Sequence, residues 1–478
     1  MNSAIEALGI TRLVTDSRKI LPGDTFVAYP GETMDGRNFI EEALKFGASS
    51  VIWDAEDFSW NPSWQVPNLP VEHLRMKAGE IADQAYGHPS EKLWVIGVTG
   101  TNGKTSSTHW IAQALTTLGK KTAIVGTLGN GFPGSLSPSL NTTPDAVTLH
   151  GIMKEYLEEG AQCVAMEVSS HALVQGRVNG IHFDVALLTN LTRDHLDYHG
   201  DMASYAAAKA SLFDFDELKY AVLNIDDALG MEILEKPLKA EKVAYGFSDS
   251  WKGKKVGGKR LKVNQGMLEI DVESSWGSGT LASSAIGRFN ASNLLGALSV
   301  LLASGCEFHA SLDALSGIEP VPGRMQQLGG GNSPLVVIDY AHTPDALENV
   351  LDTLREITEG RLFCVFGCGG DRDAGKRPMM GSVASIHADI VFVTSDNPRS
   401  EDPAAIVHQI TEGIEGDYCV ILDRGEAIRR AIADAGKGDV VLLAGKGHEA
   451  YQEIKGKRFP FSDMSCAMEG LVAWGARC

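Results

Sequence analysis

The sequence predicts an α/β protein with three domains built on open, largely parallel sheets. Its 478 residues are enough for about three domains of ordinary size. Short apolar runs that are typical of buried strands alternate with segments long enough for helices, and this alternation is typical of parallel sheets. Apolar residues make up 44% of the chain and charged residues 22%, which excludes a disordered or fibrous protein.

The first predicted domain covers residues 1–88. It contains two short runs that are typical of strands, TFVAYP at 25–30 and SSVIWD at 49–54, with a predicted helix near 38–46 between them. The turn-rich segment YGHPSEK follows at 86–92. We therefore expect the boundary to the second domain near residue 88.

The second predicted domain covers residues 89–321. Apolar runs that begin at Leu93, Thr122, Cys163, Val185 and Tyr220 alternate with helical patterns and predict a parallel sheet. An apolar helix is predicted from NASNLLGALSVLLASG at 290–305. Between these parts lies WKGKKVGGKRLK at 251–262, followed by the alternating run VNQGMLEIDV, which is typical of a β-hairpin. We interpret the lysine-rich stretch as a solvated loop rather than a binding patch, because its glycines define no fixed surface.

The third predicted domain covers residues 322–478 and begins within EPVPGR at 319–324, where two prolines prevent a helix from continuing. Four apolar runs, LVVIDYA, RLFCVFGCGG, DIVFVTSDNP and DVVLLAGKG, alternate with helical segments and predict a second α/β sheet. Seven cysteines are too sparse for a disulfide framework, and only Cys364 and Cys368 lie close together. We expect reduced, structural thiols.

The formal charge of −19 is spread over the whole chain, since each of the three segments has more acidic than basic residues. This balance argues against a nucleic-acid partner, whose phosphate backbone requires clustered lysine and arginine. Small anionic ligands stay possible. No run approaches the roughly 18 apolar residues of a membrane helix, and MNSAIEALGI lacks the pattern of a signal peptide. We expect a cytoplasmic protein without a membrane span.

The most informative motif is GVTGTNGKT at 97–105, between an apolar strand and a helical pattern. Glycines let backbone N–H groups approach phosphate oxygens, Lys104 can reach the outer phosphates, and the Thr105 hydroxyl can join Mg²⁺. Val98 stands where the standard loop has glycine, so we interpret the loop as a variant. Its main residues are Gly100, Asn102, Gly103 and Lys104. A glycine-rich turn with an incidental lysine fits this context less well.

Three further positions could take part in a reaction near this loop. Glu167 ends the apolar run CVAME, where a carboxylate can reach the ligand crevice and bind Mg²⁺, although a helix cap there is the alternative. His195, Asp197 and His199 are too crowded for structural zinc and have no cysteine, so we favour one histidine ligand to Mg²⁺ or phosphate. By composition Lys209 is a surface lysine, but burial would lower its pKa and leave an amine open to CO₂.

Seven segments, in this order, resemble the Mur ligases: TGTNGKTS, MEVSSHALVQGRV, TNLTRDHLDYHG, GRFNASNLLGA, DYAHTPD, TSDNPRSEDP and AGKGHEAYQ. The resemblance covers nearly the whole chain. The resemblance implies an N-terminal domain that binds the UDP end of the substrate, a central P-loop-type ATPase domain with a mostly parallel sheet, and a C-terminal Rossmann-like domain that binds an amino acid. These domains match the predicted boundaries.

The resemblance also implies three sets of site residues. ATP-binding residues are Gly100, Thr101, Asn102, Gly103, Lys104, Thr105, Ser106, Asn290, Asn293, Arg324, Asp339 and His342. Residues that bind the UDP substrate are Thr15, Ser17, Asn141, Thr142, Thr143, Ser169, Gln175 and Arg177, with the loop 32–34; Thr15 and this loop depart from the family's usual residues. Metal ligands are Thr105, Glu167, His195 and Lys209, the last as a carbamate that helps hold a second Mg²⁺; Lys104, Lys209, His195 and Glu167 are catalytic.

The amino-acid pocket implied by the resemblance consists of Arg372, Asp396, Asn397, Pro398, Arg399, Gly445 and Glu449. Meso-diaminopimelate carries two carboxylates and two amines, so its pocket needs a guanidinium and acidic groups; lysine-adding relatives lack Arg399. The implied function is a monomeric, ATP-dependent ligase that adds meso-diaminopimelate to the D-glutamate of UDP-N-acetylmuramoyl-L-alanyl-D-glutamate through an acyl phosphate, in peptidoglycan synthesis. Alternatives are the same reaction with L-lysine, or a non-catalytic nucleotide-binding partner protein.

Overall fold

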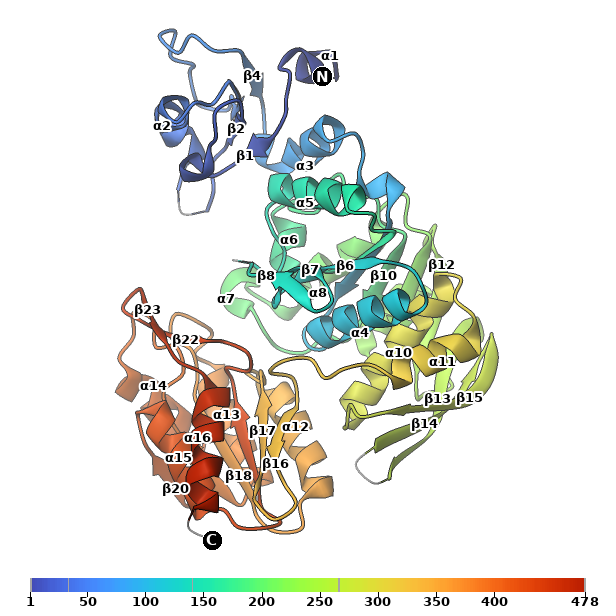
Figure 1. Ribbon diagram of the computed structural model, residues 1–478, viewed down its shortest axis with the longest axis vertical. Helices are drawn as coiled ribbons and strands as arrows, with labels where there is room; N and C mark the ends of the chain where they lie inside the picture. Colours follow the sequence, from blue (N-terminus) through green and yellow to red (C-terminus); the bar gives the residue numbers. More distant parts are fainter. Residues whose placement is uncertain (1, 33, 140, 265–266, 477–478) are drawn as a thin grey trace.

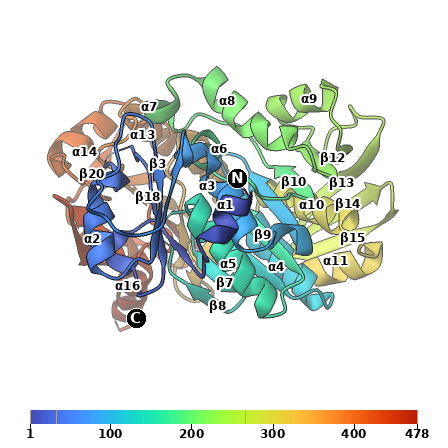
Figure 2. The ribbon, with the colours of Figure 1, turned by 90° about the horizontal axis from the view of Figure 1, so that it is seen from above.

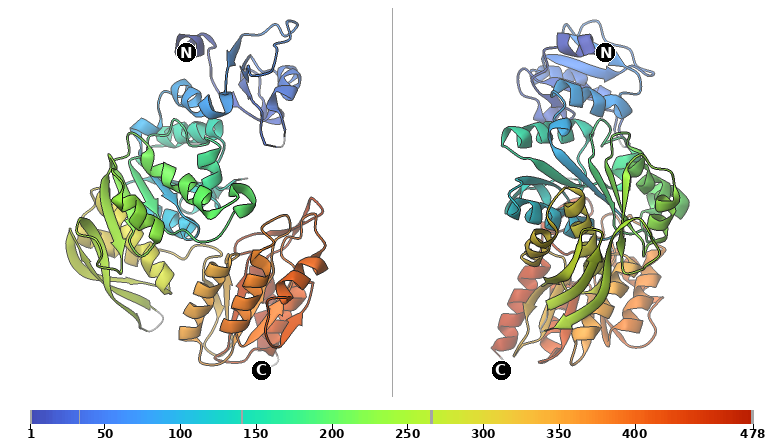
Figure 3. Two further views of the ribbon diagram at one scale, coloured as in Figure 1. Left: turned by 180° about the vertical axis from the view of Figure 1, so that it is seen from behind. Right: turned by 90° about the vertical axis from the view of Figure 1, so that its right-hand side faces the viewer.

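The computed structural model describes residues 2–32, 34–139, 141–264 and 267–476, and it contains three large sheets (Figure 1). Each sheet falls within one of the three predicted segments of the chain. The lobes built on the first and third sheets project to the same side of the central lobe, as the views from the front, from above and from behind show (Figure 1, Figure 2 and Figure 3). The exact domain bounds stay a prediction.

Four parallel strands form the first sheet, in the order β1-β2-β3-β4. Its elements are α1 (Asn2–Ala7), β1 (Leu13–Val14), β2 (Thr25–Ala28), α2 (Ile40–Lys45), β3 (Ser50–Asp54), β4 (Asn68–Val71) and α3 (Leu74–Ala85). Side chains alternate between the two faces, so that Val27 packs with Ile81 of α3 and Phe26 packs with Ile40 of α2. The predicted helix near 38–46 is confirmed as a 3₁₀ turn at 36–39 that leads into α2.

The central sheet has eleven strands in the order β15-β14-β13-β12-β11-β10-β5-β9-β6-β7-β8. The strands are β5 (Trp94–Thr99), β6 (Thr122–Gly126), β7 (Gly129–Phe132), β8 (Ser135–Ser137), β9 (Cys163–Glu167), β10 (Val185–Leu188), β11 (Tyr220–Asn224), β12 (Glu241–Gly246), β13 (Lys254–Asn264), β14 (Met267–Ser274) and β15 (Gly277–Ser283). The seven from β13 to β6 are parallel, and the edges are antiparallel. The five predicted strands, β5, β6, β9, β10 and β11, are confirmed.

Helices cover both faces of this sheet. They are α4 (Lys104–Thr117), α5 (Ala146–Glu158), α6 (Ser170–Val174), α7 (Leu196–His199), α8 (Met202–Ala210), α9 (Ala228–Glu235), α10 (Arg288–Ala303) and α11 (Phe308–Ser316). Apolar side chains of α4, α10 and α11 form a core against one face, and those of α5, α6 and α9 form a core against the other. Because both faces of the middle strands are covered, strands such as β6, β10 and β11 are largely apolar.

The prediction of a solvated loop at 251–262 is wrong, because Lys254–Asn264 form β13. This strand pairs in parallel with β12 and antiparallel with β14, so its backbone groups are satisfied within the sheet. Val256 is fully buried, while the side chains of Lys254, Lys259 and Arg260 are exposed. A strand with one solvated face can carry lysines without being a loop.

The C-terminal sheet has six strands in the order β16-β17-β21-β18-β19-β20, all parallel except β16. Its strands are β16 (Gln326–Gly329), β17 (Leu335–Asp339), β18 (Leu362–Phe366), β19 (Ile390–Val393), β20 (Tyr418–Val420) and β21 (Val440–Ala444), followed by a hairpin of β22 (Tyr451–Ile454) and β23 (Lys457–Pro460). Helices α12 (Pro344–Ile357), α13 (Lys376–His387) and α14 (Pro403–Thr411) cover one face; α15 (Arg424–Asp434) and α16 (Asp463–Gly475) cover the other.

The expectation of reduced, structural cysteines is confirmed for the described residues, where six cysteines are free. Burial raises the pKa of both Cys364 and Cys368 to about 12, so these thiols are unreactive. Within the same ranges, no helix combines the length and apolarity that a membrane crossing requires.

Candidate active site

A cavity of about 590 Å³ lies between the central and C-terminal sheets. Its lining includes residues of the phosphate loop, of the rest of the central domain and of the third domain. They are Thr101, Asn102, Gly103, Lys104, Thr105, Ser106, Thr142, Glu167, Ser169, His195, Lys209, Asn290, Asn293, Arg324, Asp339 and His342. Gly100 lies just behind this lining. The structure therefore brings together every residue predicted to bind ATP or metal.

The phosphate loop connects β5 to α4 at the carboxyl end of a central strand. Gly100 and Gly103 have φ values of +147° and +83°, which side chains rarely adopt. A Cβ atom at Gly100 would overlap the Thr189 hydroxyl, and one at Gly103 would overlap the Asn293 amide. Both positions therefore require glycine, which supports the interpretation of the loop as a variant phosphate loop.

Lys104 and Lys209 share one backbone acceptor. The Nζ atoms of Lys104 and Lys209 donate to the carbonyl of Gly100 at 2.8 and 2.7 Å. Lys209 is 1% exposed, and burial lowers its pKa well below the ordinary value, with the charge of Lys104 acting in the same direction. The interpretation of Lys209 as a surface lysine is therefore wrong: the side chain lies in the cavity, and its environment favours a neutral amine.

The side chains predicted as metal ligands fit a hard divalent cation. Glu167 is buried and accepts hydrogen bonds from the Thr105 hydroxyl at 3.0 Å and from the Thr127 amide at 2.8 Å. Among the described residues, no cationic side chain forms an ion pair with this carboxylate. Burial lowers the pKa of His195 to about 3, so the imidazole is neutral and able to coordinate. The Thr105 hydroxyl and the Glu167 carboxylate supply oxygen ligands of the kind that Mg²⁺ prefers, and the neutral His195 imidazole lies in the lining of the same cavity.

Asp194 is a residue that the sequence interpretation missed. Its carboxylate is buried and lies 3.5 Å from His342 Nε2, 3.4 Å from His195 Nε2 and 4.0 Å from Lys376 Nζ. Although burial opposes the effect, the hydrogen bond from His342 and the neighbouring charges hold the pKa of Asp194 well below its usual value. Because His342 and Lys376 belong to the third predicted domain, Asp194 joins the two sides of the cavity.

A second cavity of about 210 Å³ lies between the first sheet and the central one. Its lining residues are Tyr29, Gly31, Glu32, Arg75, Asn141, Asp145, Ala146, Gln175, Gly176 and Arg177. Glu32 accepts hydrogen bonds from Gln175 Nε2 at 2.6 Å and from the Tyr198 hydroxyl at 2.8 Å. Thus Asn141, Gln175 and Arg177, all predicted for the UDP substrate, lie together.

Thr143 connects the two cavities. Its main-chain oxygen accepts a hydrogen bond from Arg177 Nη1 at 2.9 Å, and its hydroxyl donates to the main-chain oxygen of Glu167 at 2.8 Å. Glu167 lines the first cavity and Arg177 the second. A substrate that reaches from one cavity to the other would pass this residue.

Thr15 and Ser17 line neither cavity. Ser17 is buried inside the first domain, where its hydroxyl donates to Glu42 Oε2 at 2.7 Å. Thr33, in the predicted loop 32–34, lies outside the described residues, and Met34 is exposed. The predicted uridine contacts of these residues therefore stay predictions.

The residues predicted for the amino-acid pocket lie at the carboxyl ends of β19 and β21 and in the loop after β18. Asn397 Nδ2 donates to Glu449 Oε2 at 2.8 Å, and Arg399 Nη1 donates to the Gly370 carbonyl at 2.7 Å. Arg372 is exposed beside Gly369 and donates to the carbonyl of Asp371. None of the predicted set, which is Arg372, Asp396, Asn397, Pro398, Arg399, Gly445 and Glu449, lines the 590 Å³ cavity.

Lys446 is a second residue that the sequence interpretation missed. Its side chain is fully buried, and its Nζ atom donates to Glu449 Oε2 at 3.0 Å, to Asn397 Oδ1 at 3.1 Å and to Asp396 Oδ1 at 3.3 Å. The only signal in the sequence is a lysine between two glycines in AGKGHE. Lys446 offsets the charge of two pocket carboxylates and fixes their positions.

Comparisons with known protein families match three parts of the chain in order. The Mur ligase family, catalytic domain, matches residues 9–86; the Mur ligase middle domain matches 98–301; and the Mur ligase, glutamate ligase domain, matches 323–447. These matches agree with the resemblance found in the sequence motifs.

Similar curated proteins include two named UDP-N-acetylmuramoyl-L-alanyl-D-glutamate–2,6-diaminopimelate ligase. The protein of Nitrosomonas europaea is 50% identical over 97% of this chain and 93% of its own length. The protein of Chromobacterium violaceum is 51% identical over 98% of this chain and 96% of its own length.

Solved structures of Mur ligases also match this chain. A UDP-N-acetylmuramoyl-L-alanyl-D-glutamate–2,6-diaminopimelate ligase matches with a TM-score of 0.68 and 36% identity, over 98% of this chain and 95% of that chain. A MurF ligase from Thermotoga maritima in complex with ADP matches with a TM-score of 0.68 over 98% of both chains. Because this second structure is only 20% identical to the chain, the match shows only that the two proteins share a fold.

Proposed function

Because the chain belongs to the Mur ligase family, we propose that it adds meso-diaminopimelate to the D-glutamate of UDP-N-acetylmuramoyl-L-alanyl-D-glutamate, with ATP converted to ADP and phosphate. One observation carries the proposal: a single cavity is lined by the phosphate loop, Glu167 and Lys209 on one side and by Arg324 and His342 on the other. An enzyme with this arrangement can hold ATP while the third domain supplies the amino acid. The product is a precursor of peptidoglycan.

ATP occupies the 590 Å³ cavity in this proposal. The backbone amides of the phosphate loop and Lys104 bind the phosphates, and Arg324, which donates to the Thr105 hydroxyl at 3.0 Å, adds positive charge from the third domain. Bound Mg²⁺ offsets the charge of the triphosphate. Thr105, Glu167, His195 and Lys209 as a carbamate are the residues that would hold it.

Lys209 becomes a metal ligand only after modification. Its neutral amine attacks CO₂, a C–N bond forms, and loss of one proton gives the carbamate anion. Burial supports this step because it favours the neutral amine. A ¹³C resonance of a carbamate, after incubation with labelled bicarbonate, should be present in the protein and absent in Lys209→Met; its presence in both would contradict the assignment.

The reaction has two steps. An oxygen of the D-glutamate γ-carboxylate attacks the γ-phosphorus, the bond to ADP breaks, and an acyl phosphate forms. An amine of diaminopimelate then attacks the acyl carbon, phosphate leaves from the tetrahedral intermediate, and the amine loses a proton. Lys104 stabilises charge in the first step, and approach of the third domain excludes water that would hydrolyse the acyl phosphate.

Diaminopimelate is bound by the pocket of the third domain. Arg399 pairs with its distal carboxylate, and Asp396 and Glu449 accept hydrogen bonds from an ammonium group. L-lysine has no distal carboxylate, so Arg399 favours diaminopimelate. The UDP substrate extends from the second cavity past Thr143, with Gln175 and Arg177 near its peptide.

We also propose an oligomeric state and a cellular location for the enzyme. We propose that the enzyme acts as a monomer. ATP and nucleotide-linked precursors are cytoplasmic compounds, so we place the reaction in the cytoplasm. We also propose the domain bounds 1–88, 89–321 and 322–478, which the separate sheets support.

A phosphate-release assay tests the function. ATP and UDP-N-acetylmuramoyl-L-alanyl-D-glutamate are supplied with meso-diaminopimelate, with L-lysine or with neither. We expect phosphate and tripeptide product with meso-diaminopimelate and little with L-lysine. Equal use of L-lysine would replace the proposed substrate, and ATP turnover that ignored both amino acids would contradict a ligase.

A further inference from the structure

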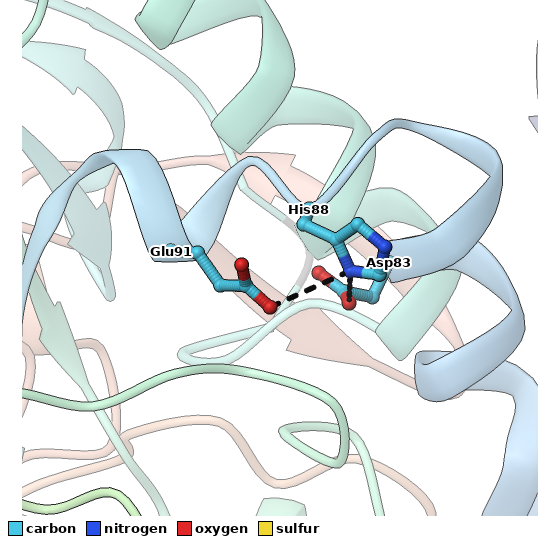
Figure 4. Close-up of side chains that lie close together, drawn as sticks. All are labelled: Asp83, His88 and Glu91. Atoms are coloured by element: carbon cyan, nitrogen blue, oxygen red, sulfur yellow. Dashed lines mark hydrogen bonds and ion pairs between the residues drawn. The ribbon is translucent and has the colours of Figure 1, made fainter.

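A cluster of side chains that could bind a metal lies outside the lining of both cavities, in the connection between α3 and the central domain. Asp83 lies near the end of α3, His88 follows the helix, and Glu91 lies in a 3₁₀ turn at 90–92. One ligand atom from each lies within 4.8 Å of those of the others, and Figure 4 shows the three side chains pointing toward one another. His88 Nδ1 is 2.6 Å from Asp83 Oδ2 and 3.6 Å from Glu91 Oε1.

The backbone holds this arrangement in place. His88 has a φ of +58°, in the left-handed region that is uncommon for histidine, and its amide donates to the carbonyl of Asp83 at 2.9 Å. The side chains of His88 and Glu91 are about half exposed. An ion from solvent can therefore reach a set of ligands that is already assembled.

A second observation comes from His150 on α5, whose side chain is fully buried. Its Nε2 atom lies 3.2 Å from the main-chain oxygen of Asn179, which can only accept, so Nε2 carries the proton. The other ring nitrogen, Nδ1, faces Asp83 Oδ1 at 3.5 Å. Neither atom has a hydrogen-bond partner among the described residues.

Two buried polar atoms that face each other without a hydrogen bond are unfavourable unless positive charge lies beside them. The Asp83 carboxylate belongs both to this buried pair and to the exposed cluster, because its other oxygen, Oδ2, contacts His88. A cation bound to Asp83 and His88 would supply that charge. The arrangement of His150 thus points to a ligand independently of the cluster itself.

We propose that Asp83, His88 and Glu91 bind one divalent transition-metal ion of the Zn²⁺ type, with the imidazole of His150 beside the Asp83 carboxylate. One imidazole and two carboxylates are ligands that Zn²⁺ accepts, and a histidine favours it over Mg²⁺ or Ca²⁺. The ion links the end of α3 to the segment that enters the central sheet. Through Asp83 and His150 it also links α3 to α5, and so it steadies the junction between the first and second domains.

The test is a titration of the metal-free full-length protein with Co²⁺, in which visible absorption reports binding. Zn²⁺ is then added to displace the Co²⁺, and excess Mg²⁺ is present throughout. We expect one equivalent of bound Co²⁺. His88→Ala, Glu91→Gln and Asp83→Asn should each weaken binding at least tenfold, because each removes a ligand. His88 and Glu91 are exposed enough for their variants to fold.

Two controls make the result specific. His408→Ala removes an exposed histidine that pairs with Glu412 on α14 at 3.3 Å and has no third ligand, and it should leave Co²⁺ binding unchanged. Glu167→Gln removes the carboxylate of the ATP cavity and should also leave the signal. Absence of stoichiometric Co²⁺ binding, or unchanged binding in His88→Ala, would overturn the proposal.

Discussion

At Arg399 the backbone has a φ of +49°, in the left-handed region that residues with side chains rarely adopt. Its amide donates to the Glu453 carbonyl at 3.0 Å, and its guanidinium donates to the Gly370 carbonyl at 2.7 Å. The hairpin of β22 and β23 therefore holds Arg399 in place. A fixed guanidinium recognises a carboxylate with little further loss of conformational freedom.

Arg399→Ala should reduce kcat/KM for meso-diaminopimelate at least 100-fold, which corresponds to about 3 kcal/mol, because the distal carboxylate loses a charged hydrogen-bond partner. The KM for ATP should stay the same. Steady-state phosphate release measures both. Arg430→Ala, which removes an exposed arginine paired with Asp434, is the matched control. Unchanged use of diaminopimelate in Arg399→Ala would contradict the proposed specificity.

Lys446→Met should destabilise the protein by about 3 kcal/mol, because the variant leaves the carboxylates of Asp396 and Glu449 without their buried cation. The KM for diaminopimelate should rise, since these carboxylates lose their fixed positions. Urea denaturation and steady-state kinetics check the two effects. Lys437→Met, at an exposed lysine, should change neither. A Lys446→Met protein with wild-type stability and KM would show that the buried lysine is dispensable.

The elements that the sequence predicted well are those buried on both sides. Parallel strands such as β9 and β21 are buried along their whole length and consist almost entirely of apolar residues, and this pattern is visible in the sequence. Short edge strands such as β8 and β20 are partly exposed and have no such pattern. β13 was predicted as a loop because its exposed lysines conceal the alternation that buries Val256.

The residues of the candidate site also divide into those that could be found from the sequence and those that could not. The phosphate loop was found by its spacing, because its glycines and Lys104 act through local backbone geometry. Asp194 and Lys446 were missed because their partners, such as His342 and Asp396, are distant in the sequence. Only the folded chain brings these charges together.

Helix α4, which follows the phosphate loop, contains a buried histidine that makes stability depend on pH. Burial lowers the pKa of His109 to about 4 from an ordinary value of 6.5. Between these values the unfolded chain binds a proton that the folded chain does not, so this contribution to stability is lost as the pH falls. Relative to His109→Asn, the wild type should lose about 3 kcal/mol between pH 8 and pH 4.

Urea denaturation of wild type and His109→Asn at several pH values checks this prediction. His309→Asn, at an exposed histidine on α11, should follow the wild-type curve. Parallel curves for wild type and His109→Asn would show that His109 does not cause the loss.

On the scale of the whole molecule, the amino-acid pocket and the ATP cavity are separate. Residues of the third domain already touch the phosphate loop, since Arg324 donates to Thr105 and Asp345 accepts from Asn102 at 3.3 Å. Arg399 and Asp396 nevertheless do not line the ATP cavity. We therefore expect the third domain to move closer to the central one before the amide bond forms.

Small-angle X-ray scattering should detect this movement. We expect the radius of gyration to fall when a non-hydrolysable ATP analogue, the UDP substrate and diaminopimelate are added together. The Arg399→Ala protein should show a smaller fall, because the amino acid is not held. A radius of gyration unaffected by all ligands would contradict closure.

The net negative charge of all three segments is compatible with anionic substrates because attraction is local. Lys104, Arg324 and Arg399, together with backbone amides, supply positive charge at the sites, although carboxylates such as Glu167 and Asp194 line the ATP cavity as well. Charge over the whole chain therefore excludes a polyanion-binding surface, but it does not exclude binding of small phosphates.

The central claim is that ATP activates the D-glutamate γ-carboxylate as an acyl phosphate, which the amine of diaminopimelate then attacks. Transfer of ¹⁸O tests this claim most directly. The UDP substrate is labelled in both γ-carboxylate oxygens, and phosphate and tripeptide are analysed by mass spectrometry. If the reaction passes through an acyl phosphate, each phosphate released carries one ¹⁸O and the amide carbonyl retains the other. Tripeptide formed with unlabelled phosphate would contradict it.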